Sequence, residues 1–354
     1  MEMGSGLKGT SNGSYNQASQ MQSRPAEPVI AYSGEAHRLK AAANSTLTFK
    51  NWQKARAMML YRCKRFLLAA AAAIALAGGP TAQAKEPSRI LSIGGAVTEI
   101  LYELGAGDRL IAVDSTSQFP PEALKTHKNV GYFRALSTEG VLSVAPDAII
   151  ASDKAGPPEV VRALKASGID YFEVNDDPNV EALTKRVRAI AGKLGQAAAG
   201  DALTARIEKG FADLAEARGR LPRNPAVLFV LSVQGGRAIV GGAETSADVV
   251  LRLAGARNVA MSLKGFKPVS EEAIIAMDPE IIVVMSRSSG PSLAQEILSV
   301  PGISATRAGR DRHLIEMDGL YILGFGPRAP AAASDLMRQL QAPAQSARAR
   351  GSKG

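Results

Sequence analysis

The chain has 354 residues, of which 46% are hydrophobic and 21% are charged, and its formal net charge is +9. Residues 1–84 hold 10 of the 42 lysines and arginines but 3 of the 33 acidic residues, so the remainder carries 32 basic and 30 acidic side chains. This near balance removes the charge argument for a nucleic-acid partner. The roughly 270 residues that follow can bury one large core or two modest ones.

Residues 58–84 have the pattern of a cleavable secretory signal peptide. A basic segment ending at Arg65 precedes the apolar run Phe66–Ala77, and Ala-Gln-Ala at 82–84 fits the cleavage site. The apolar run, about twelve residues, is too short to span a bilayer. We therefore expect a periplasmic protein whose mature form begins near Lys85.

Residues 1–57 form a polar leader rich in Ser, Gly, Asn and Ala, with no sustained hydrophobic period. Signal peptides stand at the true N-terminus, which indicates that the natural start is Met58 or Met59. Cleavage would remove the single cysteine, Cys63, and the single tryptophan, Trp52. The mature protein is therefore expected to have neither a disulfide nor thiolate chemistry.

Residues 85–196 alternate between apolar runs and helical patterns, which predicts an N-terminal α/β lobe with a parallel sheet covered on both faces. The expected strands are 89–93, 110–113, 148–151 and 171–174, and the expected helices include 98–104 and 159–167. Residues 197–223 then predict one long inter-lobe helix. Residues 224–342 predict a C-terminal α/β lobe, and 343–354 a frayed tail. In that lobe the expected strands are 226–231, 281–285 and one near 313–317, and the expected helices are 245–253, 293–298 and 327–341.

One sequence motif occurs twice, at 137–150 and at 270–283. Each copy reads Ser-x-Glu, six residues, then Pro, an acidic residue and a strand-like aliphatic run. The pattern predicts a short N-capped helix that stops before proline and is followed by a buried strand. The chain therefore has two related halves, and each carries one glutamate, Glu139 or Glu272, at the same place.

Four features carry a family resemblance: the signal peptide, the repeated Glu-x6-Pro-acid motif, the single long helix between the halves and the lack of cysteine after residue 84. Together they resemble a substrate-binding protein of the helical-backbone class, which serves importers of vitamin B12, iron siderophores and haem. The resemblance covers Pro87 to Leu340. It implies an α/β fold with two Rossmann-like lobes joined by one long helix, and a ligand cleft between the lobes. It further implies a periplasmic monomer that is not an enzyme and that touches the inner membrane only through a transporter complex.

Within that class, residues 129–137 are similar to the segment of periplasmic haem-binding proteins that presents the axial tyrosine, and residues 324–328 to the start of their last helix. Ferric iron favours anionic oxygen, and tyrosinate is a haem axial ligand. Tyr132 is thus the expected iron ligand, with Arg134 on the same side of an extended stretch, beside the phenolate or a haem propionate. The residues alone also fit a half-buried tyrosine and a solvated arginine.

The facing lobe offers weaker candidates. The expected turn 232–237 contains Arg237, a candidate for a propionate contact, and no histidine, although some haem-binding relatives carry a second axial histidine in this region. Tyr321 is a candidate aromatic wall. Five-coordinate iron through Tyr132, with one transported haem per protein, is therefore the expectation.

Glu139 and Glu272 fit first-turn acids that interact with the helix dipole. The resemblance implies more, namely that they dock onto arginines of the two permease subunits of an ABC transporter. The main rival is the same fold carrying a ferric siderophore or a corrinoid. A hydrolase with a cleft nucleophile would need an elbow such as Gly-x-Ser-x-Gly backed by a histidine, and the residues after 84 contain no such elbow.

Overall fold

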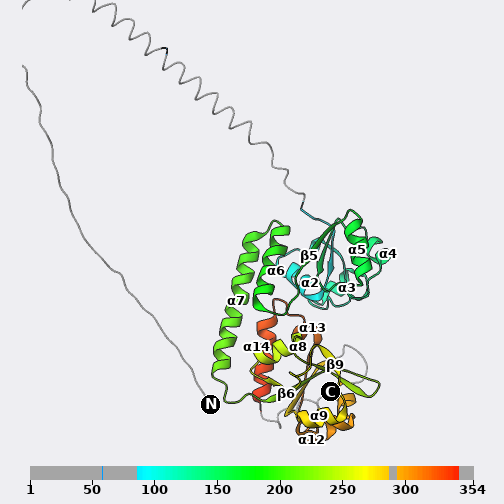
Figure 1. The fold of residues 1–354 in the computed structure, drawn as a ribbon. Helices are drawn as coiled ribbons and strands as arrows, with labels where there is room; N and C mark the ends of the chain where they lie inside the picture. Colours follow the sequence, from blue (N-terminus) through cyan, green and yellow to red (C-terminus); the bar gives the residue numbers. More distant parts are fainter. Residues whose placement is uncertain (1–57, 59–85, 287–292, 343–354) are drawn as a thin grey trace, which may run out of the picture. The chain divides into compact units, whose positions relative to one another are not determined.

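The computed structural model describes residues 86–286 and 293–342, together with Met58 (Figure 1). The expected leader 1–57, the expected signal peptide apart from Met58, and the expected tail 343–354 lie outside these residues. Residues 86–286 and 293–342 belong to one structural unit. In the part of the chain that the structure describes, no helix is long and apolar enough to cross a membrane.

The first lobe is built on a parallel sheet in the order β3-β2-β1-β4-β5. Its strands are β1 (Ile90–Ile93), β2 (Leu110–Val113), β3 (Lys128–Asn129), β4 (Ala148–Ser152) and β5 (Asp170–Val174). The residues of β1 and β4 are all buried, as expected for central strands with helices on both faces. The helices of this lobe are α2 (Gly95–Glu103), α3 (Glu122–Thr126), α4 (Thr138–Leu142), α5 (Pro158–Ala166) and α6 (Val180–Lys193), with a 3-10 turn at Gly107–Arg109.

The second lobe has a mixed sheet in the order β11-β10-β6-β7-β9, with β8 also pairing with β6. Its strands are β6 (Ala226–Gln234), β7 (Arg237–Gly241), β8 (Arg257–Asn258), β9 (Phe266–Pro268), β10 (Ile281–Ser286) and β11 (Leu314–Asp318). The helices are α8 (Ser246–Leu253), α9 (Glu271–Met277), α10 (Leu293–Leu298), α11 (Pro301–Ser304), α12 (Arg307–Arg310), α13 (Gly319–Leu323) and α14 (Ala329–Gln341). The expected α/β fold of two lobes is confirmed.

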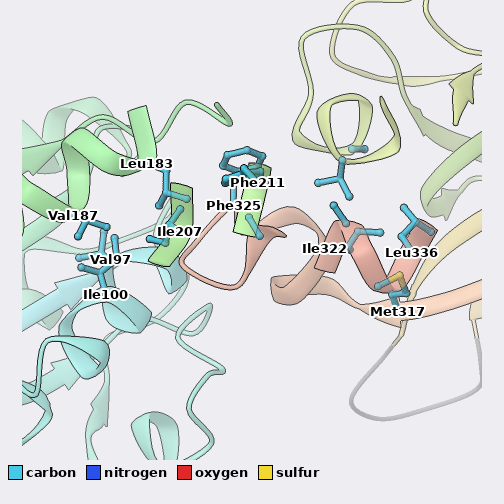
Figure 2. Close-up of a cluster of buried hydrophobic side chains, with 14 of the residues drawn as sticks. Val97, Ile100, Leu183, Val187, Ile207, Phe211, Met317, Ile322, Phe325 and Leu336 are labelled. Atoms are coloured by element: carbon cyan, nitrogen blue, oxygen red, sulfur yellow. The ribbon is translucent and has the colours of Figure 1, made fainter. Parts of the chain in front are cut away.

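Helix α7 (Ala197–Gly219) connects the lobes and packs against α6 and α14. One buried apolar cluster contains side chains from both lobes. Figure 2 shows its centre, where Phe211 of α7 stacks on Phe325, with ring centroids 5.9 Å apart. Side chains of α2 and α6, such as Ile100 and Leu183, lie on one side, and Leu336 of α14 lies on the other. The connecting helix is thus part of a core that includes residues of both lobes.

The repeated sequence motif has the same local structure in both lobes. Ser137 caps α4 by accepting a hydrogen bond from the Gly140 N–H, and Ser270 caps α9 by accepting one from the Ala273 N–H. The predicted N-capped helix is confirmed in each copy. The residue before each proline, Ala145 or Asp278, has a positive φ.

The acidic residue after each proline joins two strands. Asp147 accepts hydrogen bonds from the backbone N–H groups of Ser88 and Arg89 at the start of β1. Glu280 accepts one from the Ala226 N–H at the start of β6, at 3.3 Å. The acidic residue that follows each proline of the repeat therefore has a structural role, because its hydrogen bonds help to hold β4 beside β1 and β10 beside β6.

Candidate functional site

Tyr132 lies in a loop at the carboxyl end of β3, where ligands bind in open α/β sheets. Two neighbouring loops hold this segment: the Ser115 N–H donates to the Gly131 oxygen at 2.8 Å, and the Gly156 N–H donates to the Phe133 oxygen at 2.9 Å. Gly131 has a φ of 97°, which other residues rarely adopt. The sequence thus presents Tyr132 on a fixed turn.

The Tyr132 side chain is 47% exposed. Its ring meets Phe133 edge-on with centroids 5.1 Å apart, and the Arg134 guanidinium lies 5.0 Å from the centroid of the same Phe133 ring. Among the described residues, neither the Tyr132 hydroxyl nor the Arg134 guanidinium has a side-chain partner for a hydrogen bond or ion pair. Both residues are exposed.

The expectation of an extended stretch at this segment is wrong. The Ala135 N–H donates to the Tyr132 oxygen at 2.8 Å, which closes a tight turn over residues 132–135. Phe133, rather than strand alternation, brings Tyr132 and Arg134 together, because both side chains pack on its ring.

Arg237 is exposed and begins β7, directly after the hairpin turn Gly235–Gly236. Both glycines have positive φ, as a two-residue hairpin turn requires. The expected rim turn at 232–237 is therefore shorter than predicted, because residues 232–234 belong to β6. The charge of Arg237 acts on Glu272. Arg237 thus lies near α9.

Tyr321 is half-buried in α13, and its hydroxyl donates to Asp335 of α14 at 2.9 Å. Burial, with the hydrogen bond to Asp335, raises the pKa of Tyr321 to about 12. The Tyr321 hydroxyl is thus protonated at neutral pH and already hydrogen-bonded. The guanidinium of Arg328 lies 5.0 Å from the Tyr321 ring centroid and 3.4 Å from that of Phe119, which are distances of cation–π contacts.

Two arginine side chains link the lobes, one through an ion pair and one through a hydrogen bond, and sequence reasoning did not single out these contacts. Arg328, which precedes α14, pairs with the buried Glu99 of α2 at 3.1 Å, and its backbone N–H donates to the same carboxylate at 2.9 Å. Burial raises the pKa of Glu99, and the charge of Arg328 opposes this shift. Sequence analysis had marked the segment 324–328, whose last residue is Arg328, but without predicting its contact with Glu99.

The second contact is made by Arg186 of α6, whose side chain is fully buried. It is ion-paired with Asp176 and donates to the Phe325 oxygen at 2.8 Å. Burial lowers the pKa of Arg186 to about 10, so the guanidinium remains charged at neutral pH. Arg186 thus holds the loop before α14 against the first lobe.

Glu139 and Glu272 are exposed on α4 and α9. The pKa of Glu272 lies below its usual range, because the carboxylate accepts hydrogen bonds from its own backbone N–H and from Ser270, and the charge of Arg237 adds to this effect.

His127 is hydrogen-bonded to the Tyr102 hydroxyl at 3.0 Å. Within the described ranges, no group of three or more His, Cys, Asp or Glu residues could hold a metal ion.

Two α/β lobes joined by one long helix, with an exposed loop at the carboxyl edge of the first sheet, define a class of binding proteins. The sequence comparison agrees with this class, because a family model described as periplasmic binding protein matches residues 90–320. The chain belongs to this family. The family binds ligands for transport and is non-catalytic, which confirms the expectation that the protein is not an enzyme.

Three relatives illustrate the range of the family. A periplasmic heme-binding protein from Roseiflexus sp. RS-1, solved in apo form, is 36% identical, and the match covers 71% of this chain and 97% of that chain with a TM-score of 0.67. An uncharacterized ABC transporter substrate-binding lipoprotein of Bacillus subtilis is 26% identical over 69% of this chain and 77% of its own. The vitamin B12-binding protein of Photorhabdus laumondii is 26% identical over 72% of this chain and 88% of its own.

Proposed function

We propose that the protein captures haem and delivers it to the permease of an ABC importer. The observation that carries the proposal is the exposed Tyr132 on its fixed turn, because a phenolate oxygen is a suitable axial ligand for ferric haem iron. The similarity to the heme-binding protein from Roseiflexus sp. RS-1 supports the same ligand class. Hemin is the transported cargo, and one hemin per protein is expected with Tyr132 as its single axial ligand.

The other candidate ligand residues have separate roles in this proposal. Arg134, whose guanidinium lies 5.0 Å from the centroid of the Phe133 ring that also contacts Tyr132, is a candidate for pairing with a haem propionate. Arg237 is a second candidate for a propionate contact. Tyr321 contributes its ring rather than its hydroxyl, because the hydroxyl is bound to Asp335.

A corrinoid is the second candidate ligand, and the similarity to the vitamin B12-binding protein of Photorhabdus laumondii favours it. A ferric siderophore is also compatible with Tyr132 and Arg134, because both could contact an iron catecholate. Absorption titrations with hemin, cyanocobalamin and a ferric catecholate separate these candidates. Saturable binding of hemin alone supports the proposal, and saturable binding of cyanocobalamin alone would replace it.

Glu139 and Glu272 are the proposed docking points for the permease. The two glutamates occupy equivalent places in the internal repeat, one on each lobe, and both are exposed. A repeated pair of acids suits a partner made of two equivalent subunits that each present a basic side chain. The periplasmic location follows from the expected signal peptide at 58–84, and the protein is proposed to act as a monomer.

Charge reversal at these glutamates is expected to separate docking from ligand binding. Glu139→Arg and Glu272→Arg should each reduce hemin uptake by the cognate importer, and the double variant should reduce it further, because like charges then face each other. Hemin affinity of the purified variants should stay within about twofold, since neither carboxylate is assigned to the ligand. Uptake in proteoliposomes and hemin affinity in solution provide the two measurements.

Glu181→Arg is the matched control, because Glu181 is an exposed acid in the first turn of α6 and has no counterpart in the repeat. Uptake by this variant should equal that of the natural protein. If uptake also persists in the Glu139 and Glu272 variants, the glutamates are only helix-terminal acids. Loss of hemin affinity would instead place them at the ligand.

A further inference from the structure

Asp114 is a fully buried acidic residue that directly follows β2 in the first lobe. Its two carboxylate oxygens accept four hydrogen bonds. Oδ1 accepts from the Gly94 N–H at 2.8 Å and from the Ser117 hydroxyl at 3.0 Å. Oδ2 accepts from the Thr116 N–H at 2.8 Å and from the Thr116 hydroxyl at 2.6 Å. A carboxylate has room for about four donors, so no capacity is left over.

The loop that begins at Asp114 lies against the start of α2. The Gly95 N–H donates to the Thr116 hydroxyl at 3.0 Å, and a Cβ atom at Gly95 would lie 2.4 Å from the Thr116 backbone oxygen. Glycine at position 95 therefore permits this close approach. The hydroxyls of Thr98 and Ser117, both buried, share a hydrogen bond of 2.6 Å. The loop is thus fixed to α2 at two points.

The same loop holds the segment that carries Tyr132. The Ser115 N–H donates to the Gly131 oxygen at 2.8 Å. Ser115 is the residue after Asp114, and Gly131 is the residue before Tyr132. The direction of the Ser115 N–H depends on the conformation that the buried carboxylate imposes on its loop. A chain of contacts therefore runs from Asp114 to the turn that presents the phenolate.

We infer that Asp114 is the positioning residue for the Tyr132 phenolate. The inference rests on the proposed function, in which Tyr132 binds ferric iron, and it assigns no ligand contact to Asp114 itself. Groups that orient a metal ligand commonly change metal affinity about 10- to 100-fold when they are replaced. A carboxylate that only stabilised the fold would affect every ligand of the cleft alike, whereas a positioning residue affects the bond to iron.

The test compares hemin with metal-free protoporphyrin IX, which has the same macrocycle and propionates but no iron for Tyr132 to bind. Asp114→Asn keeps the shape of the side chain and replaces one acceptor oxygen by an NH2 donor, so donors of the loop lose their acceptor. This variant is expected to weaken hemin binding about tenfold. Its affinity for metal-free protoporphyrin IX should stay within about twofold, and Asp114→Asn should add no further loss of hemin affinity in a Tyr132→Phe background.

Asp248→Asn is the matched control, because Asp248 is a buried aspartate of the second lobe that accepts hydrogen bonds from Arg252 and Asn258. Its hemin affinity should stay within about twofold of the natural value, even where stability falls. Ser117→Ala is a milder variant that removes one of the donors to Asp114. It should weaken hemin binding about threefold, and it tests the inference if Asp114→Asn does not fold.

Hydrogen exchange of the ligand-free protein supplies a readout that needs no hemin. In Asp114→Asn, and less so in Ser117→Ala, the amides of Ser115 and Ala135 should exchange roughly tenfold faster or more, because the turn over 132–135 is held less firmly. The same amides should exchange at the natural rate in Asp248→Asn.

Faster exchange together with a loss confined to hemin supports the inference. Natural exchange in the Asp114 and Ser117 variants, an equal loss for hemin and metal-free protoporphyrin IX, or a further loss in the Tyr132→Phe background would overturn it. If the natural protein binds no hemin, or Tyr132→Phe keeps the natural affinity, the proposed function fails. Hydrogen exchange then still decides whether Asp114 fixes the Tyr132 turn.

Discussion

Arg186→Met is expected to lower the free energy of unfolding by about 3 kcal/mol, because it breaks a buried ion pair from one side. The variant loses the pair with Asp176 and the hydrogen bond to the Phe325 oxygen at 2.8 Å. Methionine fills much of the volume but donates no hydrogen bond. In the variant, Asp176 still accepts the hydrogen bond from the Ser152 hydroxyl. The Phe325 carbonyl, in contrast, loses the donor that links it to the first lobe.

Lys185→Met is the matched control for this prediction. Lys185 is the preceding residue of α6, and its pair with Glu181 joins side chains that are 73% and 75% exposed. Exposed pairs contribute little, so this variant should change stability by less than about 0.5 kcal/mol. Urea denaturation of both variants provides the comparison. Equal losses of unfolding free energy in the two variants would show that Arg186 does not hold the loop before α14 against the first lobe.

Tyr132→Ala is expected to remove the tyrosinate-type absorption of bound hemin and to weaken hemin binding at least about 100-fold, as loss of an axial ligand. Tyr132→Phe should have nearly the same effect, although it keeps the ring that packs against Phe133. Agreement between the two variants would assign the loss to the oxygen atom rather than to the shape of the turn.

Tyr171→Phe provides the control for the tyrosine variants. Tyr171 lies in β5, and its hydroxyl is buried without a hydrogen-bond partner in the described structure. Its removal should leave the hemin spectrum unchanged. An unchanged spectrum in Tyr132→Phe as well would exclude Tyr132 as the iron ligand.

Much of the fold could be predicted from the sequence because its strongest signals are local. Glycine and proline stops and apolar runs placed α7, α8, α10 and the central strands within a few residues of their observed bounds, and Ser caps placed α4 and α9. The short strands β7 and β9 were missed, because their pairing depends on the Gly235–Gly236 hairpin and on tertiary contacts. A strand of three to five residues carries too little pattern to be recognised alone.

The candidate site was predictable only in part. Tyr132 and the two glutamates stand out by residue type and by repetition, and their roles remain predictions. The link between Glu99 and Arg328 joins positions 229 residues apart, and no local pattern reports such a contact. Likewise, the tight turn after Tyr132 depends on hydrogen bonds from Ser115 and Gly156, which lie on neighbouring loops.

Titration of hemin into the purified protein, starting at Lys85 and followed by absorption, tests the central claim most directly. The account predicts a shifted Soret band that saturates at one hemin per protein and that is lost in Tyr132→Phe. A titration in which the Soret band stays that of free hemin, while cyanocobalamin or a ferric catecholate binds saturably, would contradict it.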